Sequence, residues 1–158
     1  ALAVATLNKK NISKKDFKKF HPSGNLGAKL KTVEDLMSIK EKIPFINEES
    51  TMKIALKIIT LKKLGTLIVR NTQGKTTGII TDGQIRRVIQ KNVGLYNLKV
   101  KNVMTKNPIK INRDMLAIRA LSIMNENKIT SLCVHNSKNI NKTIGIIHIH
   151  NILEVGIG

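Results

Sequence analysis

The sequence predicts a mixed α and β fold in which one structural unit occurs twice. Two long stretches of the 158-residue chain resemble each other: Met37 lies 67 positions before Met104, and Gly78 lies 67 positions before Gly145. Each stretch has one segment with apolar residues at helical spacing. Each also has short runs of β-branched residues between turn-forming residues. Two copies therefore run from about Val33 to Ile157, each in the order strand, helix, strand, strand, helix.

The first copy starts with an extended piece over residues 44–46. A helix follows, with an apolar face made of Met52, Ala55, Leu56 and Ile59. Two strands, GTLIVR and TGIIT, are joined by the turn NTQGK. The segment DGQIRRVIQ then forms the closing helix of the copy.

The second copy repeats this order. Its extended piece covers residues 109–111, and its first helix has an apolar face made of Leu116, Ala120, Leu121 and Met124. The strands TSLCVH and TIGIIH are joined by the turn NSKNINK, and HNILEVG forms the closing helix.

The composition fits one compact domain, or two small modules that share a core. With 41% hydrophobic residues, a soluble globular protein is expected. Lysines interrupt every apolar stretch, so none approaches the roughly 20 residues that span a bilayer, and we expect no membrane partner. The single cysteine, Cys133, excludes an internal disulfide and fits a reducing cytoplasm.

The formal net charge of +18 invites a nucleic-acid interpretation, because clustered cations neutralise phosphates. The lysines are spread over every segment, however, and three Phe, one Tyr and no Trp leave little aromatic surface for stacked bases. We therefore expect non-specific attraction to anions and no specific nucleic-acid partner.

The two copies, each with a G-h-h-T-x-x-D-like junction between strand and helix, resemble a tandem pair of cystathionine-β-synthase-type (CBS) domains, the regulatory Bateman module. In order, the segments DFKKFHPSGNLGAKL, VEDLM, KKLGTLIV, GIITDGQIRRVI, ITSLCV and GIIHIHNILEVGI closely resemble the carboxy-terminal half of the arabinose-5-phosphate isomerase family. The resemblance implies a sugar isomerase tail and linker over residues 1–31, a first CBS domain over 32–97 and a second over 98–158. The opening ALAVATLNKK lacks an initiator methionine, so we expect a piece of a longer polypeptide.

His21 lies in the loop FHPSGNLGAKL and resembles the histidine of a His-Pro-Gly-Gly-type loop in that family. Interconversion of an aldose and a ketose needs a general base near neutral pH, which imidazole supplies. The resemblance thus implies that His21 is catalytic in the full-length parent only. Ser23 replaces the usual glycine, and His21 stacked over Pro22 in a linker turn is the alternative.

The junctions between the last strand and the last helix are where the family's ligands bind. A helix amino terminus offers free N–H groups to phosphate, and Thr81 and Asp82 add a hydroxyl and a carboxylate. Gln84 and Asn151 stand where nucleotide-binding members carry aspartate, which argues against simple adenine-nucleotide sensing. Thr81 and Gln84 also form a helix capping box that needs no ligand.

Further candidates for ligand contact lie on both copies. Arg86 and Arg87 can clamp a phosphate or a carboxylate, although a solvated basic face also explains them. His148 and His150 resemble a His-x-His of the family, and we favour ligand contact over a metal because no acidic or cysteine partner is near in sequence. Hydroxyls that start the inner strands complete the predicted ligand-binding set: Thr66, Thr130 and Ser131.

By resemblance, the parent interconverts D-ribulose 5-phosphate and D-arabinose 5-phosphate for Kdo and lipopolysaccharide biosynthesis in Gram-negative bacteria. We expect this fragment to be inactive alone, to need no cofactor, and to bind an anionic sugar phosphate or a nucleotide sugar such as CMP-Kdo between its two copies. Homo-oligomers through the CBS pairs are also expected. The alternatives are an adenine-nucleotide sensor and a module for oligomerisation.

Overall fold

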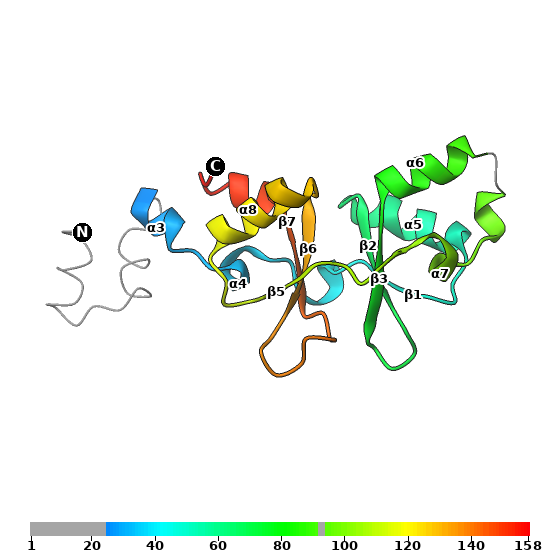
Figure 1. Ribbon diagram of the computed structural model, residues 1–158, viewed down its shortest axis with the longest axis horizontal. Coiled ribbons are helices and arrows are strands. Elements are labelled where there is room, and N and C mark those ends of the chain that lie inside the picture. Colours follow the sequence, from blue (N-terminus) through cyan, green and yellow to red (C-terminus); the bar gives the residue numbers. More distant parts are fainter. Residues whose placement is uncertain (1–24, 92–93) are drawn as a thin grey trace, which may run out of the picture.

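The computed structural model describes residues 25–91 and 94–158, and it confirms the repeated α/β unit (Figure 1). The first unit consists of β1 (Phe45–Asn47), α5 (Met52–Lys62), β2 (Thr66–Arg70), β3 (Thr76–Thr81) and α6 (Asp82–Gln90). The second unit consists of β5 (Lys110–Asn112), α8 (Ala117–Asn127), β6 (Ser131–His135), β7 (Gly145–His148) and α9 (Ile149–Leu153). Both units show the predicted order of strand, helix, strand, strand and helix.

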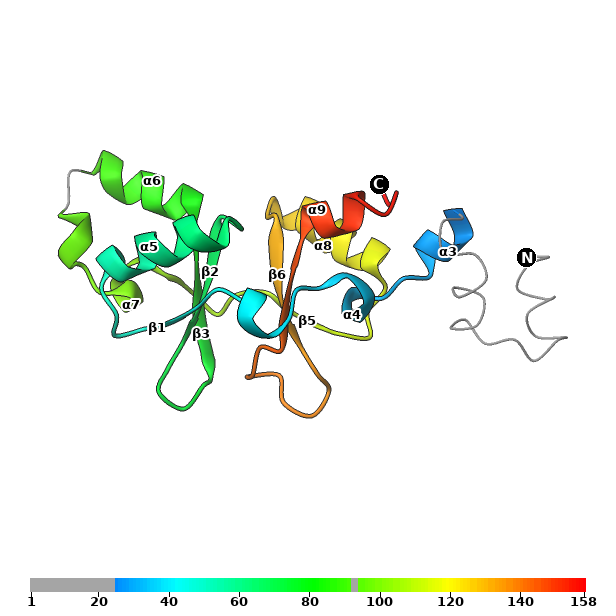
Figure 2. The same cartoon turned by 180° about the vertical axis from the view of Figure 1, so that it is seen from behind.

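The two sheets lie side by side, with the β2–β3 and β6–β7 turns at one end and α5, α6, α8 and α9 at the other (Figures 1 and 2). In each sheet the central strand, β2 or β6, pairs parallel to the first strand and antiparallel to the third. These central strands bury four consecutive residues each, which is why TLIVR and SLCVH read as continuous apolar runs instead of alternating ones. No helix of the described residues is long and apolar enough to span a bilayer.

The first helix of each unit ends in the same way. Lys63 caps α5 and Lys128 caps α8, and both adopt left-handed backbone conformations, with φ of 58° and 55°. A left-handed residue at this position ends the helix and turns the chain sharply. In both units the buried central strand begins shortly after this turn.

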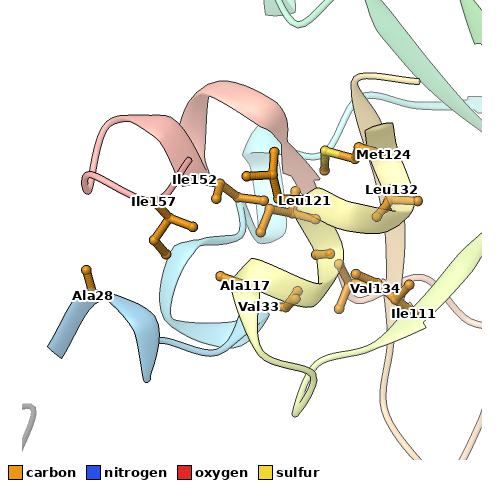
Figure 3. Close-up of a cluster of buried hydrophobic side chains, with 12 residues drawn as sticks. Ala28, Val33, Ile111, Ala117, Leu121, Met124, Leu132, Val134, Ile152 and Ile157 are labelled. Carbon is orange, nitrogen blue, oxygen red and sulfur yellow. The ribbon is translucent and has the colours of Figure 1, made fainter. Parts of the chain in front are cut away.

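A segment ahead of each unit packs onto the other unit. These leading segments are residues 32–38, with helix α4 (Val33–Leu36), and residues 99–105, with helix α7 (Val100–Val103) and the start of β4 (Thr105–Lys106). Val33 is fully buried in the core of the second unit (Figure 3), and Val100 is fully buried in the core of the first. Each leading segment therefore precedes one unit in the sequence but packs in the core of the other unit.

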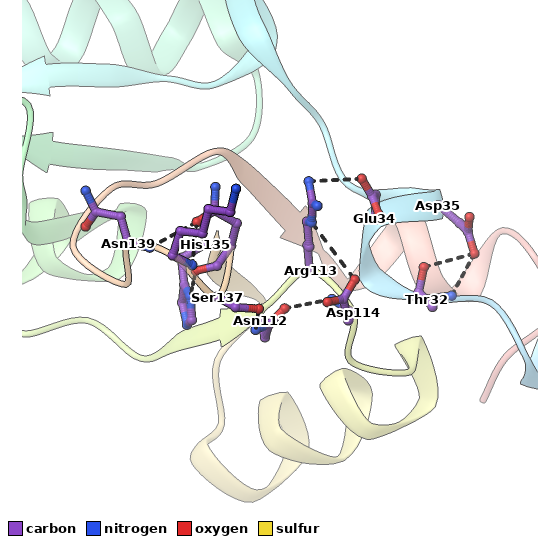
Figure 4. Close-up of polar contacts among 11 residues, drawn as sticks. Thr32, Glu34, Asp35, Asn112, Arg113, Asp114, His135, Ser137 and Asn139 are labelled. Carbon is purple, nitrogen blue, oxygen red and sulfur yellow. Dashed lines mark hydrogen bonds and ion pairs between the residues drawn. The ribbon is translucent and has the colours of Figure 1, made fainter.

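Backbone hydrogen bonds fix both leading segments in place. Val33 donates its N–H to the Met115 carbonyl at 2.8 Å, and Ala117 donates to the Lys31 carbonyl at 2.8 Å. The equivalent bonds of the first unit run from Val100 to Ser50 and from Met52 to Leu98, each at 2.8 Å. Near α4, an ion pair of 3.5 Å joins Glu34 and Arg113 (Figure 4).

The two units also share a small apolar core. Ile68 of β2 packs with Cys133 of β6 and Ile146 of β7, and Ile43 completes the buried part of this cluster. Burial raises the pKa of the Cys133 thiol to about 12, so this cysteine acts as an apolar core residue and not as a nucleophile. Thr76 and Thr143 join their hydroxyls across the same interface at 2.5 Å.

Gly78 and Gly145 allow the leading segments to approach the sheets. A Cβ atom on Gly78 would lie 2.8 Å from Met104 Cγ and 2.9 Å from the Thr105 carbonyl oxygen. On Gly145 it would lie 3.1 Å from Met37 Cγ and 3.2 Å from the Ser38 carbonyl oxygen. The 67-residue spacing of the two methionines and of the two glycines thus reflects the same Met–Gly contact, which occurs once in each unit.

We predict that Gly78→Ala destabilises the chain, because the backbone of β4 cannot move away as a flexible side chain would. Overpacking of this kind costs about 1–3 kcal/mol in the free energy of unfolding, which urea denaturation measures. Gly94→Ala is the control, since a Cβ there meets no atom within 4 Å. Equal unfolding midpoints for the two variants would contradict the account.

Candidate functional site

A cavity of about 580 Å³ lies between the two units, within the size range of small-molecule sites. Its walls come from the starts of β2 and β6, from the junction of β3 with α6, and from the chain between β4 and β5. Most of the predicted ligand-binding residues line it: Thr66, Thr81, Asp82, Arg87, Thr130, Ser131 and His148. Arg86 and His150 are not among the lining residues. His21 lies outside the described residues.

Two buried hydroxyls from equivalent positions of the units meet in the lining. Thr66 starts β2 and is 2% exposed, while Ser131 starts β6 and is 6% exposed. The Thr66 hydroxyl donates to Ser131 Oγ at 3.4 Å. Each hydroxyl oxygen also has lone pairs, so this pair can serve a ligand group that reaches the interior of the cavity.

Gln84 holds the start of α6 and joins it to the leading segment of the second unit. Its Oε1 accepts the N–H of Thr81 at 2.9 Å, which completes the capping box expected from the sequence. Its Nε2 donates to the Val103 carbonyl at 3.4 Å and to Thr105 Oγ1. The Gln84 amide is therefore engaged in holding the cavity wall.

Asp82 contributes the carboxylate of the cavity, and Gly65 makes room for it. Asp82 N–H donates to the Gly65 carbonyl at 3.1 Å. Gly65 has φ of +65°, and a Cβ there would lie 2.7 Å from Asp82 Oδ2. Glycine is thus favoured at position 65 both by the backbone conformation and by the nearby carboxylate.

His148 caps the amino terminus of α9, as Thr81 caps that of α6. Its backbone N–H donates to Asn151 Oδ1 at 2.8 Å, and its Nδ1 accepts the N–H of His150 at 3.1 Å. A ring nitrogen that accepts carries no proton, so the neutral ring of His148 bears its proton on Nε2. Burial, followed by the charge of His150, lowers the pKa of His148 below its usual 6.5. The two rings stack with centroids 4.8 Å apart.

Two cationic residues, one from each unit, line the cavity. Arg87 lies in the second turn of α6, and Lys128 is the left-handed residue that ends α8. Within the described residues, no group of three or more His, Cys, Asp or Glu side chains could hold a metal ion. Arg87 and Lys128 can meet an anionic group, and the carboxylate of Asp82 with several hydroxyls can meet sugar hydroxyl groups.

The lining also includes Lys128, Thr105 and residues 107–109, which were not predicted from the sequence. The Asn107-Pro108 dipeptide is a turn signal that marks this stretch, and Asn107 does adopt a left-handed conformation, with φ of 52°. No local signal points to Lys128, because its place in the cavity depends on how the second unit packs against the first.

The model of the family described as "CBS domain" matches residues 33–91 and 100–158. The chain belongs to the CBS domain family. Its two matched copies correspond to the two units of the fold, and the cavity lies between the domains of a CBS pair. The resemblance found in the sequence is thereby confirmed for the fold.

Among curated proteins, the CBS pair is 35% identical to arabinose 5-phosphate isomerase KdsD of Yersinia pestis over 158 residues. The match covers 99% of this chain and 47% of that protein. The chain thus spans about half the length of the curated relatives it matches.

Solved CBS pairs share the fold. The CBS domain pair of protein MJ0100, in complex with 5′-methylthioadenosine and S-adenosyl-L-methionine, is 21% identical with a TM-score of 0.70, covering 79% of this chain and 94% of that one. CBSX2 of Arabidopsis thaliana, in complex with AMP, is 22% identical with a TM-score of 0.65, covering 78% of this chain and 93% of that one.

The lowered pKa of His148 makes stability depend on pH. The unfolded chain takes up this proton at a higher pH than the folded chain does, so the contribution is complete above pH 6.5 and is lost as the pH falls through the lower folded pKa. We expect the free energy of unfolding, measured by urea denaturation, to decrease from pH 7 to pH 5.

The variant His148→Asn should reduce this decrease, because asparagine can cap a helix and does not titrate. Thr81→Asn is the matched control, since it makes the same change at the equivalent cap of α6 and removes no titratable group, and we expect it to keep the wild-type slope. The same slope in His148→Asn as in the wild type would show that His148 is not the group responsible. Glu49, whose pKa two lysines lower to about 2, titrates below this range.

Proposed function

We propose that the chain is the regulatory CBS pair of an arabinose 5-phosphate isomerase and that its cavity binds an anionic sugar phosphate or a nucleotide sugar such as CMP-Kdo. One observation carries this proposal. The cavity combines cations from both domains, Arg87 and Lys128, with the carboxylate of Asp82 and with several hydroxyl groups. Such a ligand carries the matching groups, an anionic end and sugar hydroxyls.

Each part of the lining has a partner on this class of ligand. An arginine guanidinium forms paired hydrogen bonds with a phosphate or a carboxylate, and a lysine adds a point charge. A carboxylate such as that of Asp82 accepts hydrogen bonds from vicinal sugar hydroxyls, and Nε2–H of His148 is a further donor. Apolar side chains cover the remaining surface of the ligand: Leu64, Ile79, Pro108, Ile109 and Ile129.

The reaction of the whole protein is part of the proposal. The parent interconverts D-ribulose 5-phosphate and D-arabinose 5-phosphate, with His21 as a general base. The match to an isomerase of about twice the length supports this assignment. A ligand in the cavity contacts both domains, so occupancy can alter how the pair holds the rest of the protein.

An adenine-nucleotide sensor is the second candidate. The solved CBS pairs with AMP, or with 5′-methylthioadenosine and S-adenosyl-L-methionine, favour it. Against it, amides stand at both positions where nucleotide-binding members carry aspartate, and the Gln84 amide is already engaged with Thr81, Val103 and Thr105. Asp82 remains as the carboxylate for a ribose.

Assembly into homo-oligomers is also part of the proposal. The helices on one side of the pair expose apolar side chains, among them Ile54 at 47% and Leu61 at 77% on α5. Burying these faces against a second copy would remove them from water. A cytoplasmic location fits the free thiol of Cys133.

Titration calorimetry with CMP-Kdo, AMP and ATP tests the ligand class. We expect CMP-Kdo to bind, and Arg87→Ala to weaken its affinity roughly tenfold or more, since a hydrogen bond to a charged group contributes about 1.5–3 kcal/mol. Arg86→Ala is the matched control, because Arg86 neighbours Arg87 but does not line the cavity.

Tight binding of AMP or ATP with no heat from CMP-Kdo would contradict the proposed ligand. In that event Asp82→Ala discriminates further. The adenine-nucleotide candidate requires this variant to lose AMP affinity, because Asp82 is the ribose carboxylate that remains.

A further inference from the structure

The repeat gives each residue at the strand–helix junction that lines the cavity an equivalent position in the other domain. Residues at the junction of β3 with α6 recur 67 positions later at the junction of β7 with α9. Thr81 thus corresponds to His148, and Gln84 to Asn151, and both pairs make the same capping contacts. A ligand position at one junction therefore implies an equivalent position at the other. The two can be compared residue by residue.

Of these two junctions, the first contributes more residues to the cavity lining than the second. Five residues of the β3–α6 junction line it: Thr81, Asp82, Gly83, Gln84 and Arg87. Of their counterparts, which all lie within the described residues, His148 lines it, whereas Ile149, His150, Asn151 and Glu154 do not.

The charged groups of the first junction are replaced at the second. Ile149 stands at the position of Asp82, and it packs against the core of the second domain. A ligand hydroxyl would meet no carboxylate there. Glu154 stands at the position of Arg87 and is exposed. A carboxylate at this position repels the anionic group that an arginine would attract.

The connection that leads into the first strand also differs between the two copies. In the second copy it runs from Met104 to β5, and Thr105 and residues 107–109 line the cavity. In the first copy, two more residues lie between Met37 and β1 than between Met104 and β5. This longer connection contains the short helix η1 (Lys40–Lys42), and Lys62 at the end of α5 donates to the Glu41 carbonyl.

We infer that the CBS pair binds a single ligand, at the α6 half of the cleft, and that the equivalent α9 position is excluded by Ile149, Glu154 and the η1 insertion. The anionic group lies between Arg87 and Lys128, and the sugar hydroxyls face Asp82. This inference rests on the proposed function, because it concerns the same cavity. It adds the number of ligands per chain and the residues that set it.

Equilibrium dialysis at saturating CMP-Kdo, and separately at saturating AMP, counts the ligand bound per chain. We expect one molecule per chain for the probe that binds. Arg87→Ala and Glu154→Ala are the matched pair, because they remove oppositely charged groups at equivalent positions. Arg87→Ala should weaken all binding tenfold or more. Glu154→Ala should leave the affinity unchanged and the stoichiometry at one, because Ile149 and η1 still exclude the α9 position. Unaltered thermal unfolding would show that both variants fold.

Two molecules per chain in the wild type would overturn the inference and leave the proposed function standing. The inference would also be overturned if the Arg87→Ala variant still bound half as much ligand as the wild type with unchanged affinity. If neither probe binds the wild-type chain, the proposed function fails, and the inference fails with it.

Discussion

The exchange of leading segments between the two domains is the constraint on which the rest of the structure depends. Val33 fills the core of the second domain and Val100 that of the first, so neither core is complete without residues from the other copy. The exchange needs glycine at positions 78 and 145, where the incoming methionines and backbones lie too close for a side chain. It also holds the two sheets against each other, with Ile68, Cys133 and Ile146 between them.

The cavity is a consequence of this packing. Thr105 to Ile109 reaches the cavity because the second leading segment pairs with β3, and Gln84 fastens that segment to α6. A ligand at Arg87 and Lys128 therefore touches both domains and the chain that joins them. The departures from symmetry that bear on the ligand are Ile149, Glu154 and the connection that contains η1. The two domains keep the same arrangement of strands and helices, whereas the residues available to a ligand differ between them.

Much of this could be predicted from the sequence, because the repeat and its periodicity are local signals. The helices at DGQIRRVIQ and around Met52, and the strands SLCVH and TLIVR, follow from patterns within a few residues. The exchange of leading segments could not be predicted, because the sequences VEDLM and VKNVM do not indicate which domain each segment packs on. Lys128 was missed for a similar reason. Arg86 was expected as part of an anion-clamping arginine pair, and His150 from the His-x-His that resembles the family's. The helical rotation of α6 and α9, however, sets which residue of each pair lines the cavity.

The central claim, that the ligand lies in the cleft between the CBS domains, can be tested by methyl NMR of isoleucine-labelled protein during titration with CMP-Kdo. Ile79, Ile109 and Ile129 line the cavity, whereas Ile54 and Ile140 are exposed residues outside the lining. The account predicts that the first three methyl signals shift in a saturable manner while the last two stay in place. Saturable shifts confined to Ile54 or Ile140, with the cavity signals unchanged, would contradict it.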